Sequence, residues 1–321
     1  MEAEIMMERL TLRVAGIASA AREALVVELR DPAGGELPPF TPGAHIELHL
    51  PDGLVRQYSL CDDARRRDRY RVGVGLAPAS RGGSRYIHQE LRVGDLLEVT
   101  PPRNHFPLCE DATELVFFAG GIGITPILSM ILWCEANDRP WHLFYLVRSR
   151  ERAAFLEPFA AYADKVTLHT DEEAGALFDV AATVARLPAQ AHLYTCGPMP
   201  LMLAVEAAAK KYPAEQVHFE WFSPRQIDPA QADAPFTLKL ARSGQCLEVP
   251  ADRSILQVLE ANGVRVESSC REGTCASCET RVLSGVPEHR DSVLSTAERS
   301  SNRTLMVCVS RACSAVLELD L

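Results

Sequence analysis

The cysteines near the C-terminus carry most of the chemical information in this sequence. Cys270, Cys275 and Cys278 follow a C-x4-C-x2-C pattern, and Cys308 stands alone farther along the chain. A plant-type [2Fe–2S] cluster takes four cysteines with this spacing. The other residues of the stretch CREGTCASC are mostly small, so that backbone N–H groups can approach the sulfur atoms and donate to them. The sequence therefore predicts a [2Fe–2S] site in which these four cysteines are the metal ligands.

Zinc is the alternative for this cysteine pattern, since CxxC pairs are common zinc ligands. Zinc sites usually add a second CxxC or a pair of histidines, whereas Cys308 has only Cys313 near it. We therefore favour iron–sulfur over zinc and interpret Cys313 as structural. His88 and His289 are interpreted as solvated polar residues, because an isolated histidine is more often a solvated residue than a metal ligand.

Composition excludes several classes of protein. The 321 residues include 33 basic and 43 acidic ones, and the resulting net charge of −10 argues against a nucleic-acid partner. A hydrophobic content of 47% allows two or three domains, each with a core. The start, MEAEIMMERL, lacks the apolar region of a signal peptide, and no apolar stretch is as long as a membrane span. The ten cysteines are then expected to be ligands or free thiols in a reducing cytoplasm.

The first segment, residues 1–108, is predicted to be an all-β domain. Turn signals such as DPAGG, PDG and VGD separate short β-prone runs. The runs are TLRVAGI, ALVVELRD, HIELHL, RQYSL, RYRVGV and LLEVT. Six strands at this spacing favour a closed antiparallel β-barrel.

The second segment, residues 109–226, alternates between buried-strand runs and helical patterns. The strand runs are LVFFAG, WHLFYLV, KVTLHT, AHLYTCG and VHFEWF. The helical patterns are ITPILSMILWCEAN, AAFLEPFAAYA, FDVAATVARL and PMPLMLAVEAAAKKY. This alternation is typical of an α/β domain with a parallel sheet and helices on both faces.

The third segment, residues 236–321, follows a predicted linker at 227–235 that is rich in Ala, Asp and Pro. Its strand runs are FTLKL, CLEVP, ETRVLSG, TLMVCVS and AVLELDL. A helix is predicted over SILQVLEANG, where Asn262 and Gly263 form a stop signal. These elements predict a small mixed sheet with one main helix and the cysteines in a long loop.

Two motifs in the first segment suggest a flavin site. A flavin needs an aromatic ring against the isoalloxazine, a hydroxyl donor and a cation for its phosphate, and Tyr58, Ser59 and Arg56 could supply them. The turn that contains Gly83 and Ser84 precedes a short predicted helix, YIHQEL, which favours anion binding. Taken alone, the first motif is more often the surface of an edge strand and the second an ordinary turn, but the two together favour a flavin site.

Two further motifs follow strands of the second segment. The glycines of GGIGITP come directly after LVFFA and allow a dinucleotide pyrophosphate to approach the backbone, although this is not the GxGxxG fingerprint. Cys196, Gly197 and Pro198 end the fourth strand, at the edge where open α/β sheets bind ligands. Asp171, after the third strand, is a candidate partner for an adenine ribose. Cys196 is also compatible with a buried core residue, and Asp171 with a charged surface loop.

The combination of RQYSL, RGGS, AGGIGITP, CGPMPLM and CREGTCASC, in this order, resembles the phthalate dioxygenase reductase family, which includes the reductases of vanillate demethylase and related Rieske oxygenases. The resemblance extends from about residue 9 to Leu321. It implies FMN in the barrel, NADH on the central α/β domain and a plant-type [2Fe–2S] cluster in a C-terminal β-grasp, ferredoxin-like domain.

The resemblance also implies site residues. The residues that hold FMN would be Arg56, Tyr58, Ser59, Gly83 and Ser84. The nicotinamide nucleotide would lie against Gly121, Thr125, Cys196, Gly197 and Pro198. Phe222 occupies a position where relatives place an aromatic side chain near the flavin.

The resemblance implies the reductase component of a Rieske-type aromatic-ring oxygenase or O-demethylase. A hydride from NADH carries two electrons, whereas a Rieske centre accepts one at a time. A plant-type cluster at roughly −400 mV can reduce a Rieske centre at about −150 mV or above. The cofactors carry the chemistry, and no catalytic acid or base is expected. The alternatives are a reductase for another acceptor, such as a cytochrome P450 or a hydroxylase, and a redox-sensing module without enzymatic activity.

Three further expectations concern partners. Asp171 beside the ribose would repel a 2′-phosphate, which favours NADH over NADPH. The acceptor surface is expected around the cysteine loop, where Arg271, Glu272 and Arg281 set the charge. The resemblance favours a monomer.

Overall fold

The computed structural model describes residues 9–77, 80–224 and 234–321. The chain divides into two compact units, Met1–Glu220 and Trp221–Leu321. The predicted linker at 227–235 lies outside the described residues except for its last two positions. In the part of the chain that is described, every helix is too short or too polar to cross a membrane.

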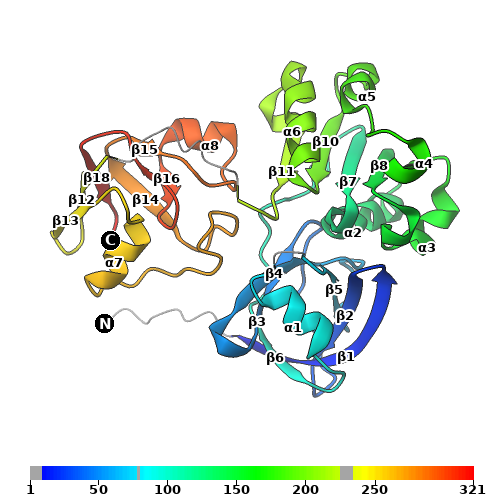
Figure 1. Ribbon diagram of the computed structural model, residues 1–321, viewed down its shortest axis with the longest axis horizontal. Coiled ribbons are helices and arrows are strands. Elements are labelled where there is room, and N and C mark those ends of the chain that lie inside the picture. Colours follow the sequence, from blue (N-terminus) through cyan, green and yellow to red (C-terminus); the bar gives the residue numbers. More distant parts are fainter. Residues whose placement is uncertain (1–8, 78–79, 225–233) are drawn as a thin grey trace. The chain divides into compact units, whose positions relative to one another are not determined.

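The first part of the first unit is an antiparallel barrel, as predicted (Figure 1). Its strands are β1 (Leu10–Ala21), β2 (Ala24–Arg30), β3 (His45–His49), β4 (Val55–Ser59), β5 (Tyr70–Gly75) and β6 (Leu96–Val99), in the order β4-β3-β6-β1-β2-β5. An antiparallel bridge between Leu60 and Val72 joins the two end strands and closes the sheet. Alternate apolar residues such as Leu29, Ile46 and Leu48 fill the interior, and α1 (Gly83–Gln89) contributes Ile87 to the same core.

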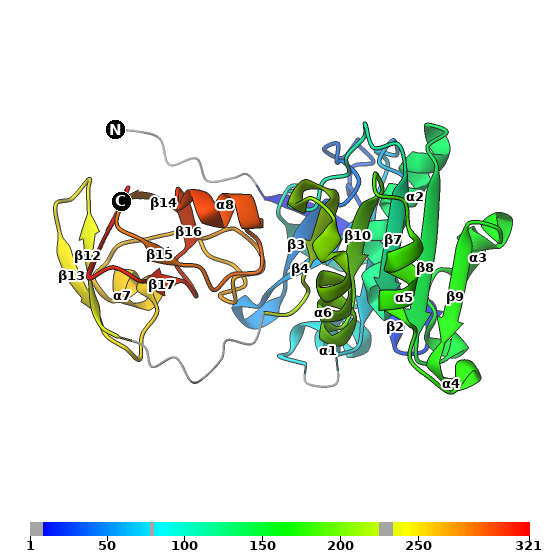
Figure 2. The ribbon, with the colours of Figure 1, turned by 90° about the horizontal axis from the view of Figure 1, so that it is seen from above.

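The second part of this unit is a parallel sheet with helices on both faces (Figure 2). Its strands are β7 (Leu115–Gly120), β8 (Trp141–Val147), β9 (Val166–Thr170), β10 (His192–Cys196) and β11 (Val217–Glu220), in the order β11-β10-β7-β8-β9. The helices are α2 (Ile124–Ala136), α3 (Leu156–Phe159), α4 (Asp171–Ala174), α5 (Val180–Arg186) and α6 (Met199–Ala208). One face packs against α2, and the other packs against α5 and α6.

The region 153–163 differs from the single helix that its sequence suggested. Phe155 has a left-handed backbone, with φ of +60°, and only α3 and a 3₁₀ turn at Ala160–Tyr162 are helical. The ring of Phe155 lies close to Gly73 of β5, so this contact with the barrel takes the place of a regular helix start.

The acidic stretch after β9 forms the helical turn α4, where the sequence also allowed a charged surface loop. The Thr170 hydroxyl accepts a hydrogen bond from the Glu173 N–H at 3.3 Å and caps this turn. Three acidic residues at its start suit the partial positive charge of a helix N-terminus.

The second unit is a five-stranded mixed sheet, as predicted. Its strands are β12 (Phe236–Leu240), β13 (Cys246–Val249), β14 (Glu279–Ser284), β16 (Thr304–Met306) and β18 (Val316–Leu319), in the order β13-β12-β18-β14-β16. Only β12 and β18 are parallel; the other pairs are antiparallel. A two-stranded ribbon, β15 (Pro287–Glu288) and β17 (Arg311–Ala312), and the helices α7 (Ile255–Ala261) and α8 (Thr296–Ser301) complete the unit. The helix α8 was not predicted, and β16 ends before Cys308.

A capping box starts α7. The Ser254 hydroxyl accepts from the Gln257 N–H at 3.2 Å, and the Gln257 side chain accepts from the Ser254 N–H at 2.9 Å. Two of the N–H groups that every helix start leaves unpaired are thereby satisfied. The cap places Ile255, Val258 and Leu259 of α7 in the core of the unit.

Replacing Ser254 with alanine removes this cap. We expect the second unit to lose about 1 kcal/mol of unfolding free energy, measured by chemical denaturation of the whole chain. Ser243→Ala, on an exposed turn, is the control. Equal denaturation midpoints for Ser254→Ala and the control would mean that the capping box contributes nothing.

Candidate functional site

The four predicted ligand cysteines converge in the second unit. Cys275 contacts Cys270, Cys270 contacts Cys308, and Cys308 contacts Cys278 through their thiol groups. The Cys275, Cys278 and Cys308 side chains are buried. The four thiols therefore form one continuous cluster, in the order Cys275, Cys270, Cys308 and Cys278. A [2Fe–2S] cluster held by four cysteines needs such a convergence.

The backbone of the cysteine loop directs donors at sulfur. The N–H groups of Glu272 and Thr274 point at Cys270 Sγ, at 3.3 and 3.4 Å, and the Cys270 N–H points at Cys275 Sγ at 3.5 Å. N–H groups directed at sulfur stabilise a thiolate and tune a cluster. The donor set thus fits an iron–sulfur cluster.

The protonation of the thiols agrees with this donor set. The contact with Cys275 holds the pKa of Cys270 far below its ordinary value, and the contact with Cys308 lowers the pKa of Cys278. Among the described residues, no three or more His, Cys, Asp or Glu side chains surround a single point that would hold one metal ion. The contact with Cys270 raises the pKa of Cys275 and of Cys308, so each low-pKa thiol lies beside a thiol whose pKa is raised.

In the barrel, β4 presents its motif residues on two faces, because side chains alternate along a strand. Tyr58 packs against the barrel core, and its burial raises the pKa of its hydroxyl to about 12. The buried Ser59, on the other face, donates a hydrogen bond to Glu220 Oε2 at 3.2 Å. The ring and the hydroxyl therefore lie on opposite faces of β4, and their contact with one flavin stays a prediction.

The predicted phosphate turn lies against Arg56. An added Cβ at Gly83 would lie 2.4 Å from Arg56 Cγ, so a side chain here would displace the arginine. The Arg56 guanidinium donates to the Arg81 carbonyl at 2.7 Å, which ties it to this turn. Ser84 Oγ accepts from the Ala77 N–H at 3.3 Å and donates to Ser80 Oγ at 2.9 Å. The cation and the turn are thus assembled in one place, which fits a phosphate.

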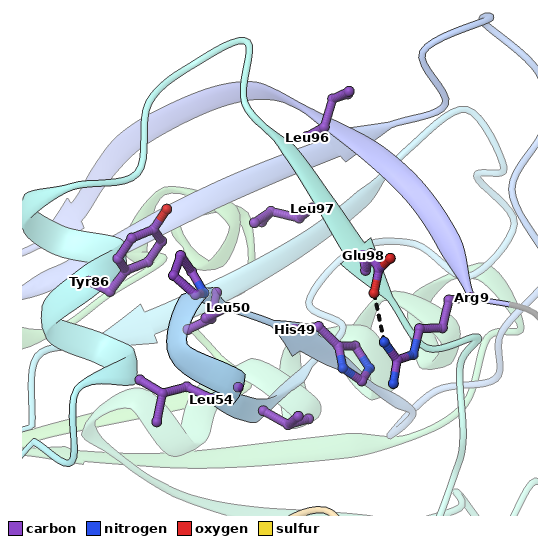
Figure 3. Close-up of a pocket in the computed structure, with 11 residues that line it drawn as sticks. Arg9, His49, Leu50, Leu54, Tyr86, Leu96, Leu97 and Glu98 are labelled. Carbon is purple, nitrogen blue, oxygen red and sulfur yellow. Dashed lines mark hydrogen bonds and ion pairs between the residues drawn. The ribbon is translucent and has the colours of Figure 1, made fainter.

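A pocket of about 490 Å³ opens on the surface of the barrel next to this turn (Figure 3). It is lined by Arg9, His49, Leu50, Pro51, Gly53, Leu54, Val55, Tyr86, Leu96, Leu97 and Glu98. Leu54 separates it from the turn, since an added Cβ at Gly82 would lie 2.9 Å from Leu54 Cδ1. Arg9 and Glu98 at its rim form an ion pair of 2.7 Å (Figure 3). Arg56 and Tyr58 are not among its lining residues, so we assign no cofactor to it.

At the carboxyl ends of β7 and β10 the two predicted nucleotide loops are packed backbone against backbone. An added Cβ would lie 2.4 Å from Pro198 Cδ at Gly120, and 2.2 Å from the Cys196 carbonyl oxygen at Gly123. Gly121, by contrast, has φ of +52° and no atom within 4 Å of an added Cβ. This left-handed residue faces open space at the edge where such sheets bind ligands, so the backbone there is accessible to a pyrophosphate.

Two of the predicted nucleotide residues are buried. Thr125 is 1% exposed; its hydroxyl donates to the Ile122 carbonyl at 3.0 Å, and its methyl group lies beside Gly73 of the barrel. Cys196 is fully buried, and burial raises the pKa of its thiol well above the ordinary value. Both residues are therefore buried packing residues of the two nucleotide loops.

Glu220 is a functional candidate that sequence reasoning missed. It ends β11, is paired in register with Cys196, and receives the hydrogen bond from Ser59. Burial raises the pKa of its carboxyl to about 8. A glutamate inside the buried-strand run VHFEWF was the one available signal, because a carboxylate in such a run needs a partner.

The ends of β8 and β9 carry charge. Asp171 Oδ1 lies 3.4 Å from His169 Nε2. Beside it, the Arg150 guanidinium makes two hydrogen bonds of 3.0 Å to the Glu173 carboxylate. Asp171 therefore lies at the edge predicted for the adenine ribose.

The remaining predicted residues lie in the second unit. Phe222 is 43% exposed, and its place beside a flavin stays a prediction. Arg271, expected on the acceptor surface, forms an ion pair of 2.6 Å with Glu260.

Comparison with known proteins agrees with an iron–sulfur site at the four cysteines. The family model described as a 2Fe-2S iron-sulfur cluster binding domain matches residues 238–313, which include all four cysteines. The phenoxybenzoate dioxygenase subunit beta of Ectopseudomonas oleovorans is 47% identical over 321 residues, covering both chains completely.

Two solved structures extend the comparison. Phthalate dioxygenase reductase, described as a modular structure for electron transfer from pyridine nucleotides to [2Fe–2S], is 41% identical with a TM-score of 0.72 and 98% of each chain covered. A type IV self-sufficient cytochrome P450 monooxygenase is 37% identical with a TM-score of 0.91; all of this chain is covered, but only 43% of that chain. The identity over nearly full length shows that the chain belongs to the phthalate dioxygenase reductase family, whose members are oxidoreductases with a C-terminal [2Fe–2S] domain.

Proposed function

We propose that this chain takes electrons in pairs from NADH and passes them singly to a Rieske-type oxygenase component. When bound, FMN supplies acceptance of a hydride and release of single electrons, and the [2Fe–2S] cluster supplies one-electron transfer. The observation that carries the proposal is the convergence of Cys270, Cys275, Cys278 and Cys308, with backbone donors directed at sulfur.

In this proposal each of the three sheet-containing segments binds one ligand. Residues 1–108 hold FMN, residues 109–226 hold NADH, and residues 236–321 hold the cluster. Each ligand then has a sheet of its own that positions its binding residues.

In the barrel, Arg56 and the turn with Gly83 and Ser84 hold the FMN phosphate. Arg56 contributes charge, and Gly83 leaves room for its side chain. Tyr58 contributes an aromatic ring, and its raised pKa keeps the hydroxyl neutral. Ser59 supplies a hydroxyl, which Glu220 orients through their hydrogen bond.

In the α/β sheet, Gly121 admits the pyrophosphate of NADH, because it adds no side chain and faces open space. Gly197 and Pro198 pack against Gly120 and fix the neighbouring loop. Thr125 and Cys196 act as buried supports. Asp171 accepts hydrogen bonds from the adenine ribose.

Glu220 adds little negative charge beside Ser59, at the end of β4. With a pKa of about 8, its carboxyl is mostly protonated at neutral pH. A neutral carboxyl can accept from Ser59 without placing an unpaired charge at the end of β4. We assign Glu220 a positioning role and no direct part in hydride transfer.

Relatives guide the choice of acceptor. The names of the similar proteins include phenoxybenzoate and phthalate dioxygenases, which supports an oxygenase partner. The likeness to part of a self-sufficient P450 supports a cytochrome P450 as the second candidate. We propose a monomer, and a cytoplasmic location because the six cysteines outside the cluster site form no disulfide in the structure.

Cys275→Ser tests the route. We expect the variant to lose reduction of a Rieske oxygenase component but to keep NADH-driven reduction of ferricyanide, because only the cluster ligands change. Cys313→Ser, at an exposed cysteine, is the matched control and should keep both activities. An anaerobic NADH titration followed by visible absorbance should bleach flavin and iron–sulfur bands in the wild type. Equal loss of both activities in Cys275→Ser would contradict the division of labour.

Glu220→Gln tests the buried carboxyl. Between pH 4.5 and about 8 the folded state binds a proton that the unfolded state has lost, so the wild type should lose unfolding free energy as pH rises through this window. Each pKa unit corresponds to about 1.4 kcal/mol. The variant lacks the titrating group, so its stability relative to wild type should rise between pH 5 and pH 8. Denaturation midpoints for wild type, Glu220→Gln and the exposed control Glu157→Gln measure this; parallel curves would refute the assignment.

Asp171→Asn tests the preference for NADH. Removing a charge that repels a 2′-phosphate should raise kcat/KM for NADPH relative to NADH by about tenfold, which is 1.4 kcal/mol. Glu172→Gln on the same turn is the control. A ratio that stays the same in Asp171→Asn would place the ribose elsewhere.

A further inference from the structure

A segment behind the cysteine loop holds the tip of that loop. The Ser292 N–H donates to the Gly273 carbonyl at 2.8 Å. An added Cβ at Gly273 would lie 3.0 Å from Asp291 Cα and 2.6 Å from Val309 Cγ2. Gly273 also has φ of +69°, which disfavours other residues. The loop tip is therefore clamped against the backbone at 291–292.

This clamp acts on the donors to sulfur. Glu272 and Thr274, whose N–H groups point at Cys270 Sγ, are the two neighbours of Gly273. The Thr274 N–H belongs to the peptide group whose carbonyl is that of Gly273, so the hydrogen bond from Ser292 orients this peptide directly. A shift of Gly273 would turn both N–H groups away from the sulfur.

The Asp291 carboxylate fixes the clamp. It is fully buried, and its Oδ2 accepts from the N–H groups of Val293 at 3.0 Å and Leu294 at 2.8 Å. These two bonds fold the backbone around Ser292 into a tight turn. The turn aims the Ser292 N–H at Gly273.

Charged and polar neighbours of Asp291 are incompletely paired. Arg299 Nη2 donates to the Asp291 carbonyl at 2.6 Å, and His289 Nδ1 lies 3.9 Å from Asp291 Oδ1. His289 is largely buried, contrary to its interpretation as a solvated residue. Three buried atoms lack a hydrogen bond in the structure: His289 Nδ1, Asp291 Oδ1 and Arg299 Nε. A buried charge with unfilled hydrogen-bonding capacity is poor support for stability, so a role at the neighbouring site explains it better.

We propose that Asp291 is a positioning residue for the [2Fe–2S] cluster, acting through its turn and Gly273 on the N–H groups directed at Cys270. The proposal rests on the proposed function, in which the four cysteines hold the cluster. N–H groups directed at sulfur stabilise the more negative, reduced cluster, so the turn raises the reduction potential and retards loss of iron.

Asp291→Ala and Asp291→Asn, each in the whole chain with its cofactors, test the proposal. Alanine removes the acceptor of the turn, whereas asparagine keeps one oxygen for Val293 and Leu294. We expect Asp291→Ala to change the electron paramagnetic resonance spectrum of the reduced cluster, lower its midpoint potential, and speed bleaching by a chelator about tenfold, as outer-shell changes at metal sites do. Asp291→Asn should stay close to wild type in all three measurements.

Two further variants separate positioning from general destabilisation. Ser292→Pro removes the N–H that Gly273 accepts but keeps the carboxylate; it should reproduce the effects of Asp291→Ala and decides the matter if that variant fails to fold. Ser254→Ala destabilises the same unit through α7 and should leave the cluster spectrum unchanged.

The outcomes are distinct. A wild-type chain without a reduced [2Fe–2S] signal would defeat the proposed function itself. A normal wild-type signal, with folded Asp291→Ala or Ser292→Pro chains that match wild type, would overturn the role of Asp291 alone. Asparagine and alanine variants with the same shifts would also overturn it, because charge rather than the turn would then be responsible.

Discussion

Both compact units of this structure depend on close contact between backbone segments, which is possible only because glycine has no side chain. Because Gly120 and Gly123 have no side chain, the loop after β7 lies directly against the loop after β10. A Cβ at either position would collide with the other loop. Gly273 does the same between the cysteine loop and the segment at 291–292. In each case the contact brings peptide groups from distant parts of the chain to one place. Peptide N–H groups are the donors that pyrophosphate and cluster sulfur both need.

Two carboxyl groups, those of Glu220 and Asp291, further stabilise the arrangement of these backbone segments. Glu220 gains a single donor, the Ser59 hydroxyl, and burial raises its pKa to about 8. Asp291 gains two backbone donors and the nearby Arg299. The first environment favours a neutral acid. The second uses its carboxyl group to organise a backbone turn, so the two side chains have different tasks because their donors differ.

Sequence patterns predicted the elements well where short β-prone runs lay between turn signals or helical patterns. The five strands of the parallel sheet and the six of the barrel came from such runs, and the cysteine spacing alone identified the four converging thiols. The run at 153–163 misled, because apolar spacing cannot reveal that Phe155 adopts a left-handed backbone against Gly73. Glu220 and Asp291 were missed for a related reason. Their significance comes from partners that are distant in sequence, Ser59 for one and the loop tip for the other. A local pattern such as VHFEWF can indicate that a carboxylate needs a partner, but it does not identify that partner.

The two halves also differ in how they expose their sites, and this difference suits their ligands. Gly121 opens onto free space, whereas Cys275, Cys278 and Cys308 are buried. A nucleotide that donates a hydride must bind and leave in every cycle, so its pyrophosphate needs an accessible backbone. A cluster must stay through many cycles, and burial of its ligands slows exchange with solvent and loss of iron. Under the proposed function, an open glycine, Gly121, therefore serves an exchangeable ligand, whereas a crowded glycine, Gly273, serves a resident one.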